Sequence, residues 1–231
     1  MKKYLIIGGS SGIGFETVNL LSAKQHQVIA TYNRTLPDLN IVNTTYHQLD
    51  ITNPECDLSF QPEVLDGLVY CPGSISLKPF GRIKPEEFAK DYELNVLGAI
   101  RCIQAALPAL KKSELASVVL FSTVAVQTGL NFHSQVAASK GALEGLTRAL
   151  AAEFAPAIRF NCIAPGLTDT PLAAGLLNSE DKKNANAQRH PMKRVGTGLD
   201  IAYLTEFLLS NSSSWITGQV MHADGGFGTL K

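Results

Sequence analysis

The sequence predicts an α/β fold: a doubly wound parallel sheet of about seven strands, with helices on both faces in three αβα layers. Two observations support this prediction. Strand-like apolar runs alternate with helix-like stretches along the whole chain, which is the pattern of a parallel sheet with right-handed crossovers. The chain has 231 residues, 45% of them apolar, which is enough for a single well-buried domain and too few for two comfortable ones.

Seven apolar runs are the expected strands. They lie near Tyr4–Gly8, Gln27–Tyr32, Thr45–Leu49, Gly67–Cys71, Ser117–Ser122, Arg159–Ala164 and Val220–Ala223. The connections between the second and fourth runs are short and rich in Pro, Asn and Thr, so we expect their helices to be trimmed or absent. Long helices with apolar residues at helical spacing are expected after Lys84–Glu87 and after His133–Gln135.

Charge and cysteine content restrict the possible partners. Twenty basic residues balance twenty acidic ones, which leaves no electrostatic footprint for nucleic acid or an anionic membrane surface. No apolar run approaches the ~20 residues that cross a bilayer, and the apolar start is too short for a signal peptide. The four cysteines form no CxxC pair and have no His cluster beside them, so we expect reduced thiols, no metal and a cytoplasmic protein.

A glycine-rich turn directly follows the first expected strand and opens a helix. Such a turn lets the backbone approach a pyrophosphate closely, while the helix N-terminus offers free N–H groups and a favourable dipole. Glycine turns also serve tight packing, so the motif by itself is moderately specific. The expected cofactor-binding residues of this turn are Gly8, Ser10, Ser11, Gly12, Ile13 and Gly14.

Three further positions have the spacing of a known active site. Thr123 ends an apolar run, Val136 follows thirteen residues later, and Lys140 lies four residues after Val136. Together with the GxxxGxG spacing of the glycine turn, this order resembles the short-chain dehydrogenase/reductase family, in which these positions hold Ser, Tyr and Lys. The resemblance implies a Rossmann-type fold, a nicotinamide cofactor and carbonyl or alcohol chemistry on a small molecule.

The resemblance spans nearly the whole chain and assigns further roles. It implies that Thr123 holds the carbonyl oxygen, that Lys140 grips the nicotinamide ribose, and that Asn95 shapes the helix backbone around a water beside that lysine. Further cofactor contacts are implied at Asp50, Ile51, Gly73, Pro165, Gly166, Thr168 and Thr170. The chain departs from the family pattern at Ile7, where a Thr is usual, and at Tyr70–Pro72, where the family has Asn-Asn-Ala.

Val136 is the departure that affects the chemistry, because valine can neither give nor take a proton. His133, about one helical turn away, is the candidate substitute, since an imidazole titrates near neutrality. A lone His before a helix is more often a cap or a surface residue, and that alternative stays open. Ser122, Gln127 and Ser134 are weaker candidates. Losing a general acid typically costs about 10²- to 10⁴-fold in rate, which leaves room for a slow enzyme.

Cofactor choice depends on the end of the second expected strand. An Asp or Glu there would bind the ribose hydroxyls of NAD and repel a 2′-phosphate, but this chain has Asn33 and Arg34. A guanidinium would meet that phosphate with a fork of donors. The sequence therefore favours NADP(H), with NAD(H) possible; the alternative is that Arg34 is an exposed loop cation.

The segment 171–193 is polar in its second half and follows a Pro-Gly turn. One interpretation is a mobile flap over the substrate, which is the role of this stretch in the family, and the other is a solvated connecting helix.

Two main hypotheses of function follow. The first is an NADP(H)-dependent oxidoreductase with an atypical proton donor, and the second is a dinucleotide-binding protein with little or no redox activity, serving as a sensor or partner subunit. A non-redox lyase or isomerase on the same fold stays open as a third. We also expect a homo-oligomer, a tetramer or a dimer, because the two long helices carry apolar residues on more faces than one sheet contact can bury.

Overall fold

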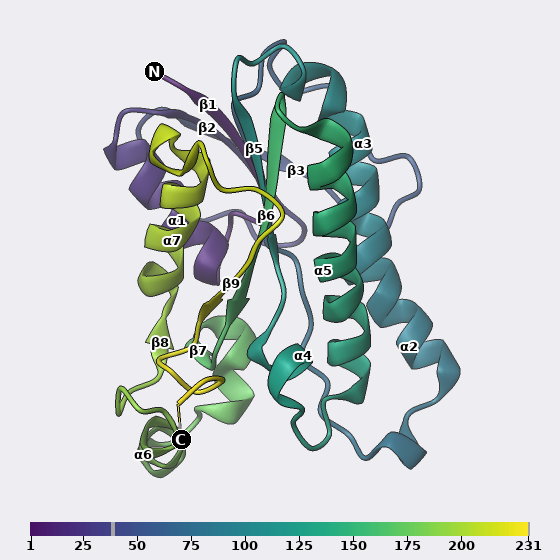
Figure 1. Ribbon diagram of the computed structural model, residues 1–231, viewed down its shortest axis with the longest axis vertical. Helices are drawn as coiled ribbons and strands as arrows, with labels where there is room; N and C mark the ends of the chain where they lie inside the picture. Colours follow the sequence, from purple (N-terminus) through teal and green to yellow (C-terminus); the bar gives the residue numbers. More distant parts are fainter. Residues whose placement is uncertain (38–39, 231) are drawn as a thin grey trace.

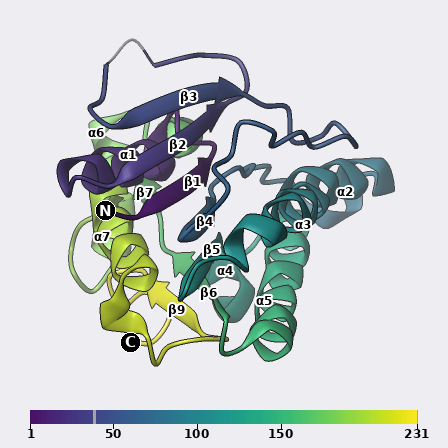
Figure 2. The same ribbon diagram turned by 90° about the horizontal axis from the view of Figure 1, so that it is seen from above.

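The chain folds into three layers around a parallel sheet. The computed structural model describes residues 1–37 and 40–230, and in it seven strands pair in the order β3-β2-β1-β4-β5-β6-β9. Helices α1 (Gly12–Ala23) and α7 (Gly198–Leu209) cover one face of this sheet, while α3 (Gly98–Leu110) and α5 (Ser134–Phe154) cover the other (Figures 1 and 2). The predicted doubly wound α/β fold is confirmed.

All seven predicted strands are present, and each end lies within one residue of its predicted position. Their bounds are β1 Lys3–Ile7, β2 Gln27–Tyr32, β3 Thr44–Gln48, β4 Gly67–Tyr70, β5 Ala116–Phe121, β6 Ile158–Pro165 and β9 Val220–Ala223. In the described part of the chain, no helix connects β2 to β3 or β3 to β4, as their Pro- and Asn-rich sequences predict. The strand β3 consequently forms a partly exposed edge of the sheet.

The core has two halves, one on each face of the sheet. Along β1, Leu5 and Ile7 pack on the side of α3 and α5, whereas Tyr4 and Ile6 pack on the side of α1 and α7. This alternation follows the two-residue period of a strand. Because both faces are covered, the inner strands are apolar throughout, and the sequence shows them as continuous runs.

The chain reverses direction across the sheet between β1 and β4. From β1 it winds outward through β2 to β3, and from β4 it winds the other way through β5 and β6 to β9. The loops after β1 and β4 therefore diverge at the carboxyl edge of the sheet, which is where open parallel sheets bind their ligands.

One long helical run contains a π-helical turn. Helix α2 (Pro85–Tyr92) continues through η2 (Glu93–Leu97), which has π geometry, into α3. The Tyr70 hydroxyl at the end of β4 donates to the Leu94 carbonyl at 2.6 Å, and a Cβ at Gly98 would lie 2.4 Å from that hydroxyl. A glycine at position 98 thus permits the contact that joins β4 to the π turn. Such π turns are frequent at functional sites.

A second, two-stranded sheet was not predicted from the sequence. It pairs β7 (Thr168–Asp169) with β8 (Gly196–Thr197) and closes the segment between them into a loop. That segment contains η3 (Pro171–Leu176) and α6 (Glu180–Arg189). Strands of two residues show no alternation, so no sequence pattern could have indicated them.

None of the described helices has the length and apolarity needed to cross a membrane.

On the outer surface of the α2–α3 run, the residues Tyr92 and Leu97 are 41% and 37% exposed. The expected homo-oligomer stays a prediction.

We predict that Tyr70→Phe lowers the free energy of unfolding by about 1–3 kcal/mol, because it removes the donor of a part-buried hydrogen bond to the Leu94 carbonyl in the π turn. Urea unfolding monitored by circular dichroism measures the change. The matched control is Tyr203→Phe on α7, where the exposed hydroxyl makes no hydrogen bond with the described residues. Equal stability of the two variants would contradict the anchoring role of Tyr70.

Candidate functional site

Two adjoining cavities open at the carboxyl edge of the sheet. The wide cavity has a volume of about 600 Å³ and the narrow cavity about 260 Å³. The residues that line both are Ile13, Cys71, Gly73, Thr170 and Leu172. A single extended ligand could therefore occupy both cavities.

The narrow cavity is built on the glycine turn. Gly8 and Gly12 have φ values of +75° and +54°, which glycine adopts without strain, and a Cβ at Gly14 would lie 2.3 Å from the Gly8 carbonyl oxygen. Helix α1 begins at Gly12, and the Ser11 side chain does not cap it. The backbone N–H groups of its first turn are consequently available to an anion.

Most of the predicted cofactor-binding residues of this end line the narrow cavity. They are Gly8, Ser10, Ser11, Gly12, Ile13, Gly14, Asn33, Ile51 and Gly73. Arg34 and Asp50 do not line it, although their neighbours Asn33 and Ile51 do, and both side chains are exposed. Hydrogen bonds from Thr52, with the charge of Arg34, lower the pKa of the Asp50 carboxyl.

The wide cavity contains the predicted reaction end. Thr123, His133, Val136 and Lys140 all line it, so residues from α4 (Val124–Thr128), α5 and their flanking loops meet at one wall. Val136 and Lys140 lie one turn apart on the same side of α5. The cavity remains open beside Val136, although that side chain is buried.

Lys140 is a buried cation near an unpaired acceptor. A Cβ placed on Gly73 would lie 3.4 Å from Lys140 Nζ and 3.6 Å from Asn95 Oδ1, so both polar atoms face this glycine. Asn95 is fully buried, and its Oδ1 has no hydrogen-bond partner among the described residues. A buried acceptor without a partner is costly, which indicates that a bound group or a water belongs between these atoms.

Burial lowers the pKa of Lys140 to about 8, while Cys162, Asp91 and Cys71 act in the opposite direction. Burial therefore weakens the hold of this lysine on its proton. Burial also raises the pKa values of the Cys71 and Cys162 thiols to about 12, which keeps both thiols protonated.

A polar cluster behind Lys140 was missed by the sequence analysis. The Asp91 carboxylate is buried and accepts hydrogen bonds from Ser74 Oγ and, at 2.5 Å, from Ser139 Oγ. The amide of Asn95 donates to the Asp91 carbonyl at 2.9 Å and to Ser74 Oγ at 3.2 Å. The signal that could have indicated this cluster is Asp91, an acidic residue on the buried side of α2.

The hydroxyl groups near the cavity differ in what they are free to do. Thr123 caps α4, because its Oγ1 accepts from the Ala125 N–H at 3.3 Å, and its hydroxyl hydrogen remains available. Ser122 donates to Glu144 at 2.6 Å and is thereby committed to α5. Ser134 Oγ is buried without a partner among the described residues, and neither Ser134 nor Gln127 lines the wide cavity.

Two histidines line the wide cavity, and only His133 was predicted. The Nδ1 atom of His133 lies 2.7 Å from the Asn131 carbonyl oxygen, and that of His190 lies 2.9 Å from the Asn186 carbonyl oxygen. Each carbonyl favours the tautomer protonated on Nδ1, which leaves Nε2 for a ligand. His190 belongs to the segment 171–193, whose polar sequence gave no sign that this histidine is buried.

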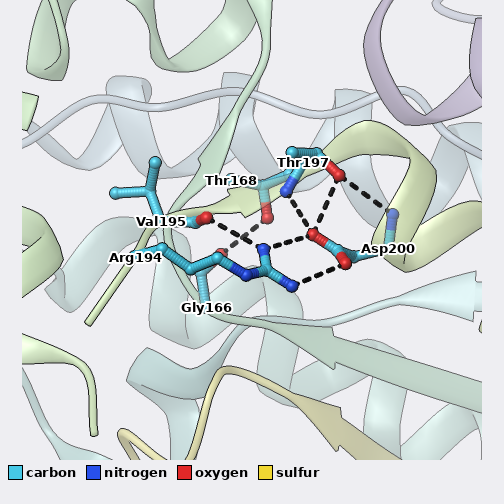
Figure 3. A network of polar contacts seen from close by, with 6 residues as sticks. All are labelled: Gly166, Thr168, Arg194, Val195, Thr197 and Asp200. Atoms are coloured by element: carbon cyan, nitrogen blue, oxygen red, sulfur yellow. Dashed lines mark hydrogen bonds and ion pairs between the residues drawn. The ribbon is translucent and has the colours of Figure 1, made fainter. Parts of the chain in front are cut away.

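The segment 171–193 is pinned at its base. Arg194 donates to Asp200 at 2.6 and 2.8 Å, and Asp200 accepts from the Thr197 backbone and hydroxyl at 2.7 and 2.8 Å (Figure 3). The guanidinium of Arg194 holds the pKa of the Asp200 carboxyl well below its usual range. The segment itself carries the solvated helix α6, and its movement as a flap stays a prediction.

The predicted residues after β6 also face the wide cavity. Pro165, Gly166, Thr168 and Thr170 line it, and Thr168 Oγ1 donates to the Gly166 carbonyl at 3.0 Å (Figure 3).

Within the described residues, no group of three His, Cys, Asp or Glu side chains could hold a metal ion.

Comparisons with known proteins show the family of this chain. The family model described as enoyl-(acyl carrier protein) reductase matches residues 8–228. A tropinone reductase homolog of Arabidopsis thaliana is 35% identical over 243 residues, covering 98% of this chain and 92% of the relative. The chain belongs to the short-chain dehydrogenase/reductase family.

Another relative and two solved structures are similar to this chain over nearly their whole length. The 3-oxoacyl-[acyl-carrier-protein] reductase MabA of Mycobacterium tuberculosis is 28% identical, covering 98% of this chain and 93% of the relative. The ligand-free aldohexose dehydrogenase of Thermoplasma acidophilum is 26% identical with a TM-score of 0.92, covering 100% of this chain and 95% of its own. ElxO with NADP bound is 29% identical with a TM-score of 0.89, covering 98% of each chain.

We predict that Lys140→Met stabilises the cofactor-free protein by about 2–3 kcal/mol at pH 7, because it removes a desolvated charge while keeping the side-chain volume. Above pH 8 the folded lysine loses its proton, whereas the unfolded lysine keeps it up to about 10.5. The unfolded state then binds more protons, so the stability of the lysine protein rises with pH relative to the variant. Denaturant unfolding of both proteins from pH 7 upward measures the difference between their free energies of unfolding. A difference that does not become smaller as the pH rises would contradict the burial of the charge.

Proposed function

We propose that the chain is an NADPH-dependent oxidoreductase that interconverts a carbonyl group and an alcohol on a small molecule. The observation that carries the proposal is the place of Lys140. Its buried Nζ and Asn95 Oδ1, which has no partner among the described residues, both face Gly73, a residue that lines both cavities. Family membership supports the same activity class.

The residues of the two cavities fit a nicotinamide dinucleotide. The uncapped start of α1 suits the pyrophosphate, and the glycines at positions 8, 12 and 14 leave room for it. Ile51 lines the narrow cavity and would meet the adenine, with the exposed Asp50 next to it outside the wall, and Lys140 would meet the nicotinamide ribose. Thr168 and Thr170, with Pro165 and Gly166, would line the nicotinamide end. Bound there, NADPH supplies the hydride of the reduction.

The preference for NADPH rests on the end of β2. The described residues there carry no carboxylate after Tyr32, and Arg34 is exposed next to Asn33, a residue of the narrow cavity. The structure of ElxO with NADP bound supports a cofactor of this kind in the same fold. NAD(H) is the second possibility.

We predict that NADPH binds more tightly than NADH and that Arg34→Ala removes much of the difference. A charge-assisted hydrogen bond to phosphate is worth about 1.5–3 kcal/mol, or roughly a tenfold change or more in Kd. Fluorescence titration of both cofactors measures it, with Arg82→Ala, on the 3₁₀ turn η1 (Phe80–Arg82) away from both cavities, as the control. Equal affinities for the two cofactors, or no effect of Arg34→Ala, would overturn the assignment.

In the proposed carbonyl reduction, His133 donates the proton. Thr123 holds the carbonyl oxygen with its free hydroxyl hydrogen, and the protonated imidazole donates from Nε2. The carbonyl carbon gains the hydride, the carbonyl π bond breaks, and the oxygen gains the imidazole proton. The histidine is left as the tautomer protonated on Nδ1, which is the form that the Asn131 carbonyl stabilises. The segment 171–193 would cover the substrate during this step.

One alternative is a dinucleotide-binding protein with weak or no catalysis; it is motivated by valine at position 136 alone, and the family relatives do not favour it. ElxO provides a useful comparison, because a variant of it with one tyrosine replaced by phenylalanine has been solved with NADPH bound. Cofactor binding and turnover therefore have to be measured separately. If His133→Gln abolishes a wild-type activity and leaves NADPH binding unchanged, the enzyme proposal stands.

We predict that Val136→Tyr increases the reduction of an activated carbonyl, such as a diketone, by NADPH. The open cavity beside Val136 can receive a phenol, which could recover part of the roughly 10²- to 10⁴-fold that general acid catalysis contributes. Loss of NADPH absorbance measures the rate, and Val136→Phe is the control for bulk without a hydroxyl. If the tyrosine variant folds and binds NADPH yet shows no gain over the phenylalanine variant, Thr123 and Lys140 are not poised for hydride transfer.

A further inference from the structure

We propose that the substrate is an apolar carbonyl compound with a carboxylate group, and that Arg189 and His190 bind this carboxylate in the wide cavity. This inference rests on the proposed function, because it names the substrate class of the same site. It is carried by the charge of the cavity wall and by the Arg189 guanidinium and the His190 imidazole, which pack against one aromatic ring.

The cavity wall is largely apolar. The side chains that give it this character come from the loops after β4, β5 and β6 and from η3, and they include Leu77, Leu130, Phe132, Leu167, Leu172 and Leu176. A volume of about 600 Å³ is in the range of small-molecule sites, and part of it lies beside Lys140, where the cofactor would end. The remaining space suits the body of a medium-chain or cyclic molecule.

The charge of this wall has one sign. Its ionisable side chains other than Cys71 are Lys140, Arg189, His133 and His190, and no described Asp or Glu lines the cavity. The nearby carboxylates are engaged with other groups. Asp91 accepts from Ser74 and Ser139, Asp169 pairs with Lys183, and Glu144 accepts from Ser122. Asp224 accepts from the backbone N–H groups of Gly226 and Gly228. A positive wall around an apolar cavity favours an anionic ligand.

Arg189 and His190 converge on Phe227 of the C-terminal segment. The guanidinium carbon of Arg189 lies 5.4 Å from the centre of the Phe227 ring, and the His190 ring centre lies 5.2 Å from it. The Asn186 carbonyl accepts from Nδ1 of His190, so Nε2 carries a second N–H donor only in the imidazolium form. In that form the packing places this donor beside the Arg189 guanidinium, and neither group binds a carboxylate among the described residues.

Arg189 differs in this respect from two other cations of the same region. Lys183 pairs with Asp169 at 2.8 Å, and Arg194 is held by Asp200. Arg189 makes one long contact, from Nη1 to Asn186 Oδ1 at 3.5 Å, and no ion pair with the described residues. Its position as the last residue of α6 suits the helix dipole, but the dipole does not explain a cavity wall without acidic groups. A planar fork of donors suits a carboxylate.

The test compares three carbonyl compounds of equal chain length. They are an oxo-octanoate with its ketone next to the terminal methyl group, the methyl ester of that acid, and the corresponding methyl ketone. We expect the acid to have the highest kcat/KM with NADPH. Arg189→Gln should lower kcat/KM for the acid about tenfold, mainly through KM, and leave the ester and the ketone unchanged. Lys182→Gln, on the same helix and outside the cavity wall, should change none of the three.

A binding measurement separates this inference from the proposed function. Octanoate cannot be reduced, so its calorimetric titration into the complex with NADPH reports the anion site without turnover. We expect octanoate to bind, and to bind about tenfold more weakly to Arg189→Gln than to Lys182→Gln. If octanoate fails to bind, or binds equally to both variants, the inference is overturned even when the ketones are reduced. If octanoate binds through Arg189 while no carbonyl compound is reduced, the carboxylate site stands and the reductase proposal fails.

Discussion

A lysine ammonium buried at the carboxyl edge of a parallel sheet has to be compensated by the groups around it. Lys140 lies on α5, with Asn95 in the π turn and Gly73 after β4 as its neighbours, and the Asp91 carboxylate adds a distant favourable charge. Desolvation still dominates, since the pKa of the lysine falls to about 8. The fold thus keeps a charge that costs stability, which is understandable where that charge binds a ligand.

The backbone around this charge depends on close approaches that allow only glycine. Gly98 lets the Tyr70 hydroxyl reach the Leu94 carbonyl, which fixes the π turn that presents Asn95. Gly14 lets the start of α1 close onto the Gly8 carbonyl, which forms the narrow cavity. The first contact lies on the β4 side of the point where the chain reverses direction, and the second lies on the β1 side. Gly73 lines both cavities, and Lys140 lies beside it in the wide one.

Val136 gives the wide cavity an apolar surface at the position where the family resemblance implies a tyrosine, and it lines this cavity. In the proposed reductase the proton is therefore supplied by another side chain. The imidazoles of His133 and His190 are each held through Nδ1 by a backbone carbonyl, so each can act through Nε2. His133 follows a loop before α5, whereas His190 is brought in by the segment between β7 and β8.

The sequence by itself determined the alternation of strands and helices along the chain, the glycine turn, and the spacing of Thr123, Val136 and Lys140. These features depend on short periods and on local backbone geometry. It also indicated most residues of the narrow cavity. Only the tertiary structure decided that Asp91, Arg189, His190 and Phe227 belong near the site, and that Arg34 and Asp50 stand outside the wall of the narrow cavity. These residues come from distant segments whose local sequence carries no sign of their neighbours. Long-range packing, through the β7–β8 pair and the C-terminal segment, brings Arg189, His190 and Phe227 together.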